Sequence, residues 1–542
     1  MTSVAALVEA VTQDLTAPSL GRLFEQQAKA CVDPSVRSAY SSTDVSIFVS
    51  FLSSQWKLIL ENGPTILSST ANGDDDEDDD GLSYTYTSTS TDVPDAPRTT
   101  FRNAAVLTLH VDALLSSYRF FRNVCVATPA TQTKLSVLLQ PTLDILPIVI
   151  GWLDTSDQSI ASQLALTVQV MLQFLGNMVV AHVDNQDIVW RRFHPALLEK
   201  ILVECHQHRK MIAYAAAIIV NCLNPPQASR TDDFVASRQI VILLLQRCLT
   251  PTTPVDEADP AFEWITMVFQ LLLQRHCTAA LYQNLSASLL SSLWSKLTPE
   301  KMLLLRMVDM IFTDDKNMLE SMEETALVDF FCGEFCALHS DDTSAASVGD
   351  DEDDLKLDPA PSEDRQAMWK VMELESSKLI LDILGALTSQ QVAKTSEATE
   401  KFVKTLIQQL QVHATTHSRS TNAFNLSEMD DIPQDASFGY RSAGIRALGN
   451  LVHRNKQIQD TVRLSGGLEV LLNSCNIDPR NPMIREWALV ALRHVCEDNE
   501  ANQAYIRALS PQEVVPRMDL SNMNVEPVLE GDKVHLKPKA NP

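Results

Sequence analysis

Two short groups of cysteine and histidine residues are the first candidates for chemistry in this sequence. The groups are Cys205, His206 and His208, and Cys332, Cys336 and His339. Thiolates and imidazoles are the ligands that zinc prefers, and the second spacing places its members on one helical face. Neither group has the paired spacing of a zinc finger, and cysteines in apolar helices usually serve packing. The sequence therefore predicts buried thiols and no cofactor, with a metal-handling role as an alternative.

Motifs of common enzymes are absent. The sequence contains no Gly-x-Gly pair, no phosphate-binding GxxxxGK loop and no HExxH motif. No serine stands in the context of a nucleophile elbow. We therefore predict that the chain is not an enzyme and has no catalytic residues.

A second kind of polar pattern recurs along the chain and indicates binding rather than catalysis. Each occurrence consists of two apolar residues, one further residue and then Asn or His. A Gln follows nine residues after that Asn or His. The four pairs are Asn123 and Gln132, Asn177 and Gln186, Asn450 and Gln459, and His494 and Gln503. The first two pairs are 54 residues apart and the last two 44, and armadillo and HEAT repeats have periods of about 40–47 residues. The pattern predicts armadillo-like repeats, with a short insertion between the first two pairs.

The asparagine or histidine of each pair has two interpretations. In armadillo proteins an equivalent asparagine binds the backbone of an extended peptide in a concave groove, which makes Asn123, Asn177, Asn450 and His494 candidate groove residues. Alternatively these side chains satisfy backbone groups between neighbouring repeats. The sequence leaves both interpretations open.

The elements that carry these residues are helices. Glycine accounts for 15 of 542 residues, about 3% against a usual ~7%, and sheet-rich folds need more. Long segments have apolar residues at three- and four-residue intervals, such as Val235, Ile242, Leu245 and Leu249. Prolines fall between the segments. The predicted fold is all-α, an armadillo-like α-α superhelix that forms one elongated body.

The stretch from 438 to 509 carries a more specific signal. Its landmarks are Phe438-Gly439, Leu448-Gly449-Asn450-Leu451, Asn455-Lys456, Gln459-Asp460, Cys475-Asn476-Ile477-Asp478, Asn481-Pro482, Glu486-Trp487 and Asn502-Gln503. This stretch resembles the C-terminal module of the ataxin-10 family, in a fungal or other lower-eukaryote form. His494 departs from the family pattern, which has asparagine there. The resemblance implies a non-enzymatic interaction protein, with a role in cytokinesis and cell survival.

Three residues of this stretch form a structural signature. Asn481 is predicted to cap the helix that follows it, and Pro482 lies where a missing N–H costs nothing. Trp487 would then share one apolar stripe with Val490, Ala491 and Val495, so we expect its ring to pack in the module.

The net charge of −26 bears on the partners. A polyanion is repelled by phosphate backbones, so we predict protein partners on a concave helical-repeat surface and no nucleic acid. Seven of the acidic residues are consecutive, from Asp74 to Asp80, and a second acidic run spans 341–364. Both runs are predicted to be disordered, and Ser347 fits an acid-directed kinase site. The oligomeric state is not determined by the sequence.

The chain has features of an intracellular protein. Glu9 and Asp14 interrupt the apolar N-terminus, which also lacks a basic leader, so no signal peptide is predicted. The uncharged run 164–183 has Gln169, Gln173 and Asn177 on one helical face, which indicates a packed helix and no membrane insertion. We expect a cytoplasmic protein, and the sequence is also compatible with a second, nuclear location.

An importin-like transport adaptor is the alternative function. It would require Trp-x-x-x-Asn pairs along a groove, and no tryptophan precedes a motif asparagine by four residues. The predicted segments are 1–61 (N-terminal helices), 62–99 (acidic linker), 100–338 (helical array), 339–365 (acidic loop), 366–414 (helical pair), 415–437 (linker), 438–510 (C-terminal ataxin-10 domain) and 511–542 (tail).

Overall fold

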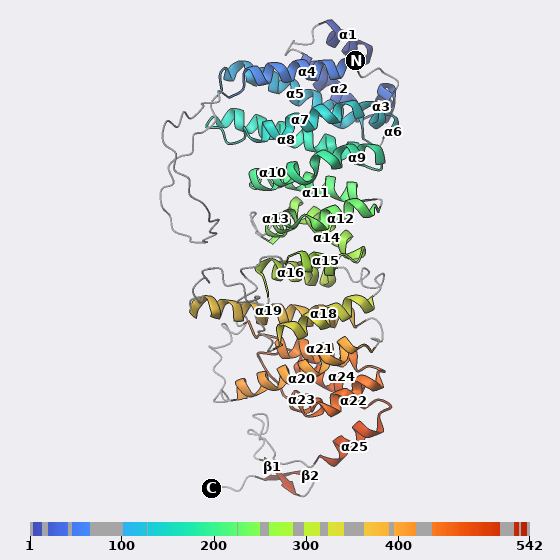
Figure 1. Ribbon diagram of the computed structural model, residues 1–542, viewed down its shortest axis with the longest axis vertical. Helices are drawn as coiled ribbons and strands as arrows, with labels where there is room; N and C mark the ends of the chain where they lie inside the picture. Colours follow the sequence, from blue (N-terminus) through green and yellow to red (C-terminus); the bar gives the residue numbers. More distant parts are fainter. Residues whose placement is uncertain are drawn as a thin grey trace, which may run out of the picture. The chain divides into compact units, whose positions relative to one another are not determined.

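The residues that the structure describes form an all-α protein, as predicted, with one β-hairpin in addition (Figure 1). The computed structural model describes residues 4–13, 20–41, 46–64, 101–126, 128–224, 226–249, 259–285, 297–314, 324–340, 363–389, 395–418, 436–509, 525–530 and 533–538. The predicted acidic linker and loop lie almost wholly outside these residues, as does Ser347.

The chain divides into two compact units, Met1–Asn284 and Leu285–Pro542. The division falls inside the array predicted for 100–338. Each unit is a stack of helical repeats, so the predicted solenoid class is confirmed for both.

Unit 1 contains helices that stack in successive layers (Figure 1). They are α1 (Val4–Gln13), α2 (Leu20–Ala30), α3 (Pro34–Ser41), α4 (Ser46–Glu61), α5 (Ala104–Val124), α6 (Pro129–Leu135), η1 (Ser136–Leu138), α7 (Leu139–Ile150), α8 (Gln158–Val179), α9 (Val183–Arg192), η2 (Phe193–Leu197), α10 (Leu198–Glu204), α11 (Arg209–Leu223), α12 (Ala228–Ala236), α13 (Arg238–Leu249), α14 (Pro260–Gln274) and α15 (Thr278–Asn284).

Four long helices of unit 1 pack side by side in the order α5, α8, α11 and α14. Each is the last helix of its repeat, and we call these the third helices. Local capping sets the start of three of them: Asn103 caps α5, Asp157 caps α8, and Asp259 caps α14 with Pro260 in its first turn. Helix α8 has 22 residues and α11 has 15, so part of the predicted insertion between the first two pairs is extra helix.

Unit 2 repeats this arrangement. Its elements are α16 (Pro299–Asp314), α18 (Glu324–Leu338), α19 (Glu363–Leu387), α20 (Glu397–Ser418), α21 (Tyr440–Leu451), α22 (Lys456–Leu464), α23 (Gly467–Asn473), α24 (Ile484–Cys496), α25 (Glu500–Ala508), β1 (Val525–Glu530) and β2 (Lys533–Pro538). Helices α19, α21 and α24 are its neighbouring third helices. A Cβ on Gly449 of α21 would lie 3.1 Å from that of Ala491 on α24, so glycine permits this close approach.

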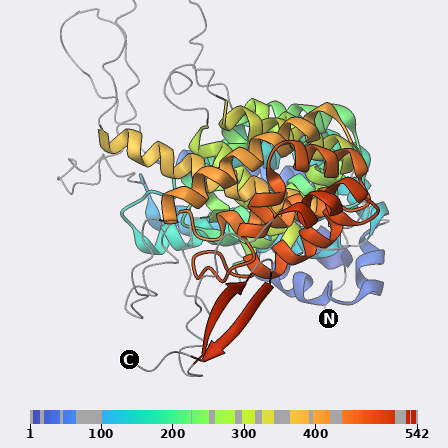
Figure 2. The ribbon, with the colours of Figure 1, turned by 90° about the horizontal axis from the view of Figure 1, so that it is seen from below.

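The hairpin differs from the predicted tail. Strands β1 and β2 pair antiparallel, with Glu526 opposite Lys537 and Glu530 opposite Lys533 in register (Figure 2). Two residues, Gly531 and Asp532, separate the strands, which is a spacing typical of a tight hairpin. An unstructured tail was predicted here because the region contains several prolines. Pro527 and Pro538 are nevertheless compatible with a two-stranded ribbon, because both strands are edges.

Candidate functional site

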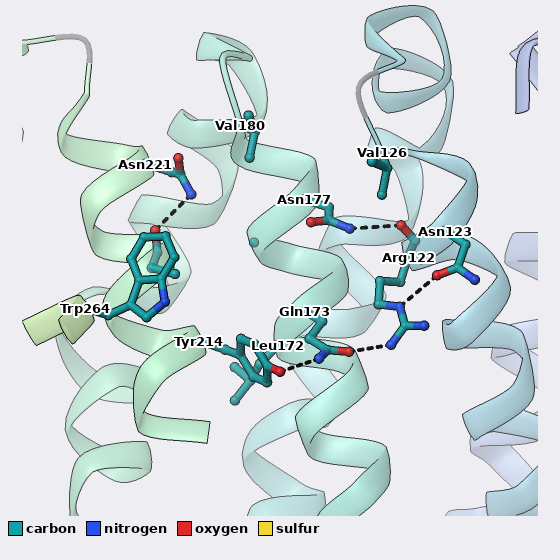
Figure 3. A pocket seen from close by; sticks show the side chains of 12 residues that line it. Arg122, Asn123, Val126, Leu172, Gln173, Asn177, Val180, Tyr214, Asn221 and Trp264 are labelled. Carbon is teal, nitrogen blue, oxygen red and sulfur yellow. Dashed lines mark hydrogen bonds between the residues drawn. The ribbon is translucent and has the colours of Figure 1, made fainter. Parts of the chain in front are cut away.

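A hollow of about 410 Å³ lies on unit 1 across the third helices (Figure 3). Its walls come from α5, α8, α11 and α14, together with residues just beyond the ends of α5 and α8. The lining residues are Arg122, Asn123, Val126, Leu172, Gln173, Gly176, Asn177, Val180, Tyr214, Ala217, Asn221 and Trp264. Successive third helices therefore contribute one surface with both polar and apolar side chains.

A chain of hydrogen bonds crosses three of these helices (Figure 3). Arg122 Nη1 donates to Gln173 Oε1 at 2.6 Å, and Gln173 Nε2 donates to the Tyr214 hydroxyl oxygen at 2.5 Å. Arg122 Nε donates to Asn123 Oδ1 at 2.9 Å. These contacts fix the direction of the Gln173 amide, so the Tyr214 proton is free to donate outward. Burial, with Arg119 nearby, lowers the pKa of Arg122 from its usual value.

The motif side chains of all four pairs make the same contact. Each donates to a backbone carbonyl of the preceding third helix or, for the first, of α2. Asn123 donates to Ala28 at 2.8 Å, Asn177 to Arg122 at 2.9 Å and Asn450 to Gly385 at 3.0 Å. His494 Nδ1 lies 2.9 Å from the carbonyl oxygen of Gly449, and because that oxygen can only accept, Nδ1 carries the proton. The histidine thus reproduces the asparagine contact.

The glutamines of the first three pairs reach in the other direction along the stack. Gln132 donates to Asn177 O at 2.7 Å, and Gln459 donates to His494 O at 2.9 Å, both at the end of the following third helix. Gln186 likewise donates to Asn224 O at 3.2 Å. Gln503 donates to Cys496 O, within its own repeat. In the first three pairs, the two motif residues therefore join a repeat to both of its neighbours.

These contacts bear on the open interpretations of the asparagines. The amide nitrogens of Asn123, Asn177 and Asn450 are engaged between repeats. Asn123 and Asn177 nevertheless line the hollow together, whereas Asn450 and His494 lie in the other unit. The assignment of all four to a partner groove stays a prediction.

The repeat that ends in α11 was missed by sequence reasoning. Asn221 follows Asn177 by 44 residues and also lines the hollow, but its amide donates to Ala217 O within α11. Arg230 stands where the glutamine is expected, and its guanidinium donates to Cys222 O at 2.6 Å and to Gln186 Oε1 at 3.0 Å. A 44-residue step from Asn177 would have found this repeat if arginine had been accepted in place of glutamine.

The cysteine and histidine groups pack as expected for buried thiols. Burial raises the pKa of Cys205 to about 12 and holds that of Cys332 well above its usual value. His339 hydrogen-bonds the Ser377 hydroxyl at 2.8 Å. Within the described ranges, no group of three or more histidine, cysteine or acidic residues is placed to hold a metal ion.

Two stretches of unit 1 are long and apolar enough to cross a membrane, Pro129–Ile150 and Gln158–Val179. Half of the apolar window in each is buried inside the unit. The second stretch is α8, which packs between α5 and α11. Core helices pass such a test, and no membrane insertion is indicated.

Asn481 caps a helix other than the predicted one. Its Oδ1 accepts from the backbone N–H groups of Arg441 at 2.9 Å and Ser442 at 3.4 Å, in the first turn of α21. The residue before α21 is Gly439 at φ +77°, which has no side chain to cap with. Helix α24 instead begins after Met483, without a side-chain cap. Asp478 accepts from Asn481 Nδ2 at 2.8 Å and holds the cap in place.

The comparisons with known proteins match this C-terminal region most specifically. Residues 440–537 match the family described as the spinocerebellar ataxia type 10 protein domain. The chain is 24% identical to ataxin-10 of Macaca fascicularis over 440 residues, which is 80% of this chain and 83% of the relative. Residues 440–537 thus carry the domain of the ataxin-10 family, and the similarity to ataxin-10 proteins extends at lower identity over most of the chain. We call residues 440–537 the ataxin-10 module; it includes the hairpin.

Other matches separate the module from the rest of the chain. An ataxin-10 homolog of Dictyostelium discoideum is 41% identical over 88 residues, 16% of this chain and 14% of the homolog. The alignment with a solved structure of an engineered protein covers 90% of this chain and 98% of that protein, with 13% identity and a TM-score of 0.27. A likeness at that score carries no weight, so the fold rests on the helices described above.

The apolar stripe of the ataxin-10 module contains two of the four predicted residues, Ala491 and Val495. Ile484, Ala488, Ala491 and Val495 are at most 2% exposed and form the buried face of α24. Val490 is 40% exposed, and Trp487 is half-buried. Trp487 therefore lies at the edge of the core. Pro482 is exposed, and its carbonyl accepts from Ser442 Oγ at 2.7 Å.

Proposed function

We propose that this chain is a non-enzymatic scaffold that binds other proteins through its helical repeats. The observation that carries the proposal is the hollow of unit 1. Four successive third helices present side chains to it, and Val126 and Val180 on its lining are 39% and 47% exposed. Exposed apolar side chains beside half-buried polar groups are typical of a surface that binds a chain segment.

The similarity to ataxin-10 proteins supports a finer proposal. By analogy with the ataxin-10 family, the scaffold acts in the regulation of cytokinesis and cell survival, in the cytoplasm and with access to the nucleus. Fold alone would not support this assignment, because helical repeats serve many functions. The repeat architecture and the absence of catalytic motifs in the sequence are compatible with it.

Capture of partners from cells tests the scaffold proposal, with two valine variants of equal exposure. Val180→Glu places a charge in the hollow, and Val203→Glu places one on α10, where the original side chain is 46% exposed but outside the hollow. Full-length wild type and both variants are cross-linked in cells, captured, and compared by quantitative mass spectrometry. We expect Val180→Glu to lose a defined set of proteins that Val203→Glu retains.

The melting temperature of both variants is measured in parallel, and both should match wild type because each site is half exposed. If both valine variants capture the same proteins as wild type, the hollow is not the binding surface and the proposal is wrong for unit 1.

A further inference from the structure

The charge of the hollow specifies the chemistry of its occupant. Its twelve lining residues include one cation, Arg122, and no aspartate or glutamate. This is unusual for a chain with a net charge of −26. The hollow is thus a local positive site on an acidic protein, which favours a negatively charged ligand group.

Among the residues that the structure describes, Arg122 has no anionic partner. None of the ion pairs among the described residues includes it, and its Nε and Nη1 donate to the neutral amides of Asn123 and Gln173. Glu25, which acts on it electrostatically, is paired with Arg119 at 3.3 Å. Two neutral amides replace only part of the hydration that a half-buried guanidinium loses, and a carboxylate adds short, charge-assisted hydrogen bonds and a counter-charge.

The hydrogen-bond chain ends in a second donor. Arg122 donates to Gln173, which in turn donates to the Tyr214 oxygen, so each bond polarises the next toward the Tyr214 proton. Both ends of the chain therefore offer donors to a ligand. A ligand that satisfies both must present acceptors, such as a carboxylate at Arg122 and a backbone carbonyl near Tyr214.

The apolar lining sets the form of the ligand. Val180, after α8, lies between Asn221 and Asn177, and Trp264 on α14 lies beyond Asn221 (Figure 3). Neighbouring helices are about 8–10 Å apart, so a segment that crosses the four third helices spans about 24–30 Å. At about 3.3 Å per residue, an extended peptide of about eight or nine residues covers this length.

We propose that the hollow binds an extended peptide segment of a partner protein through an acidic side chain, whose carboxylate pairs with Arg122 while apolar side chains contact Trp264 and Val180. This inference rests on the proposed function and names the partner chemistry of the same site.

The test uses three pools of fluorescein-labelled nonapeptides and the full-length protein. The central residue is Glu, Gln or Lys, and the other positions are an equal mixture of Ser, Thr, Val, Leu and Phe. Binding is measured by fluorescence anisotropy at low and at physiological salt. We expect the Glu pool to bind about tenfold more tightly than the isosteric Gln pool, with the Lys pool weakest, and the Glu preference to shrink as salt is added.

Variants of the protein show which residue causes the preference for the Glu pool. Arg122→Gln should bring the Glu and Gln pools to equal affinity, whereas the matched control Arg191→Gln, at an exposed position of α9, should leave the preference unchanged. Tyr214→Phe should weaken all pools alike, because it removes a donor but no charge. Thermal melts of the variants show whether unit 1 stays folded.

The outcomes separate the two proposals. Equal binding of the Glu and Gln pools by wild type, or a Glu preference that survives in folded Arg122→Gln, overturns the acidic-peptide inference and leaves the scaffold proposal standing. No binding of any pool, together with unchanged capture by Val180→Glu, overturns both.

Discussion

Replacement of Asn481 by alanine should destabilise a helix that begins 41 residues before it. The Asn481 side chain is 3% exposed, and its Oδ1 serves two N–H groups of the first turn of α21. Alanine leaves the N–H groups of Arg441 and Ser442 without this acceptor in a site too enclosed for water to replace it. Gly439 cannot take over the cap, because it has no side chain.

The size of the effect follows from two contributions. Loss of a helix cap costs about 1 kcal/mol, and a buried donor left without a partner costs about 1–3 kcal/mol. Since the two describe partly the same loss, we expect about 2–3 kcal/mol. Local opening of the first turn of α21 should then be about 30- to 150-fold more frequent.

Hydrogen exchange read by mass spectrometry measures this directly on the peptide that contains Arg441 and Ser442. The matched control is Asn476→Ala, which removes an exposed asparagine whose only described contact is a long 3.5 Å hydrogen bond to Asn473 O. Asn481→Asp keeps the acceptor but faces the carboxylate of Asp478, so its exchange should be intermediate. If Asn481→Ala exchanges and melts like Asn476→Ala, the cap between the two helices is not a stabilising contact.

Three further changes in unit 2 have defined outcomes. Asn450→Ala should cost about 1 kcal/mol in urea unfolding, because it removes a hydrogen bond between repeats; an unchanged midpoint would contradict that role. Trp487→Ala should cost about 1 kcal/mol, well below the ~3–5 kcal/mol of a buried ring, and a larger loss would show that the tryptophan is a core residue. Burial, then the charge of Asp382, raises the pKa of Asp309 to about 6. The contribution of this carboxyl to folding stability is fully present below its unfolded pKa of 3.8 and is lost as the pH rises through 6. Asp309→Asn should therefore stabilise unit 2 by about 1–2 kcal/mol at pH 7.5 and have little effect at pH 4. The exposed Asp314→Asn is the control, and equal pH profiles for the two variants would contradict the assignment.

Periodicity was enough to predict the helical class and the repeat register. The nine-residue spacing between the asparagine and the glutamine recurs because each side chain hydrogen-bonds a carbonyl at a fixed place in the stack. The repeat of Asn221 was missed because Arg230 satisfies the same region of backbone with a different side chain. Backbone acceptors can be reached by amide, imidazole or guanidinium groups, so a search for one residue type underestimates the number of repeats.

Local rules failed where a contact connects distant parts of the chain. Asn481-Pro482 has the sequence of a helix start, but the asparagine caps α21, and only the stacking of the two helices brings them together. The buried face of α24 was predicted only in part, because Trp487 and Val490 are apolar but lie at its exposed edge. The hollow was not predictable, because Arg122, Tyr214 and Trp264 follow no shared spacing.

The hydrogen bonds between repeats have a consequence for how such a chain changes during evolution. In the motif contacts a side chain on one helix meets a main-chain carbonyl on the preceding third helix, as in the contacts of Asn177 with Arg122 O and of Asn450 with Gly385 O. Every residue type supplies that carbonyl, so a mutation at the accepting position leaves the acceptor intact. The accepting half of each contact is therefore insensitive to substitution, and the side chain of the residue whose carbonyl accepts is free to vary. This asymmetry allows the outer surfaces of the repeats to diverge widely while the repeats continue to stack in the same register.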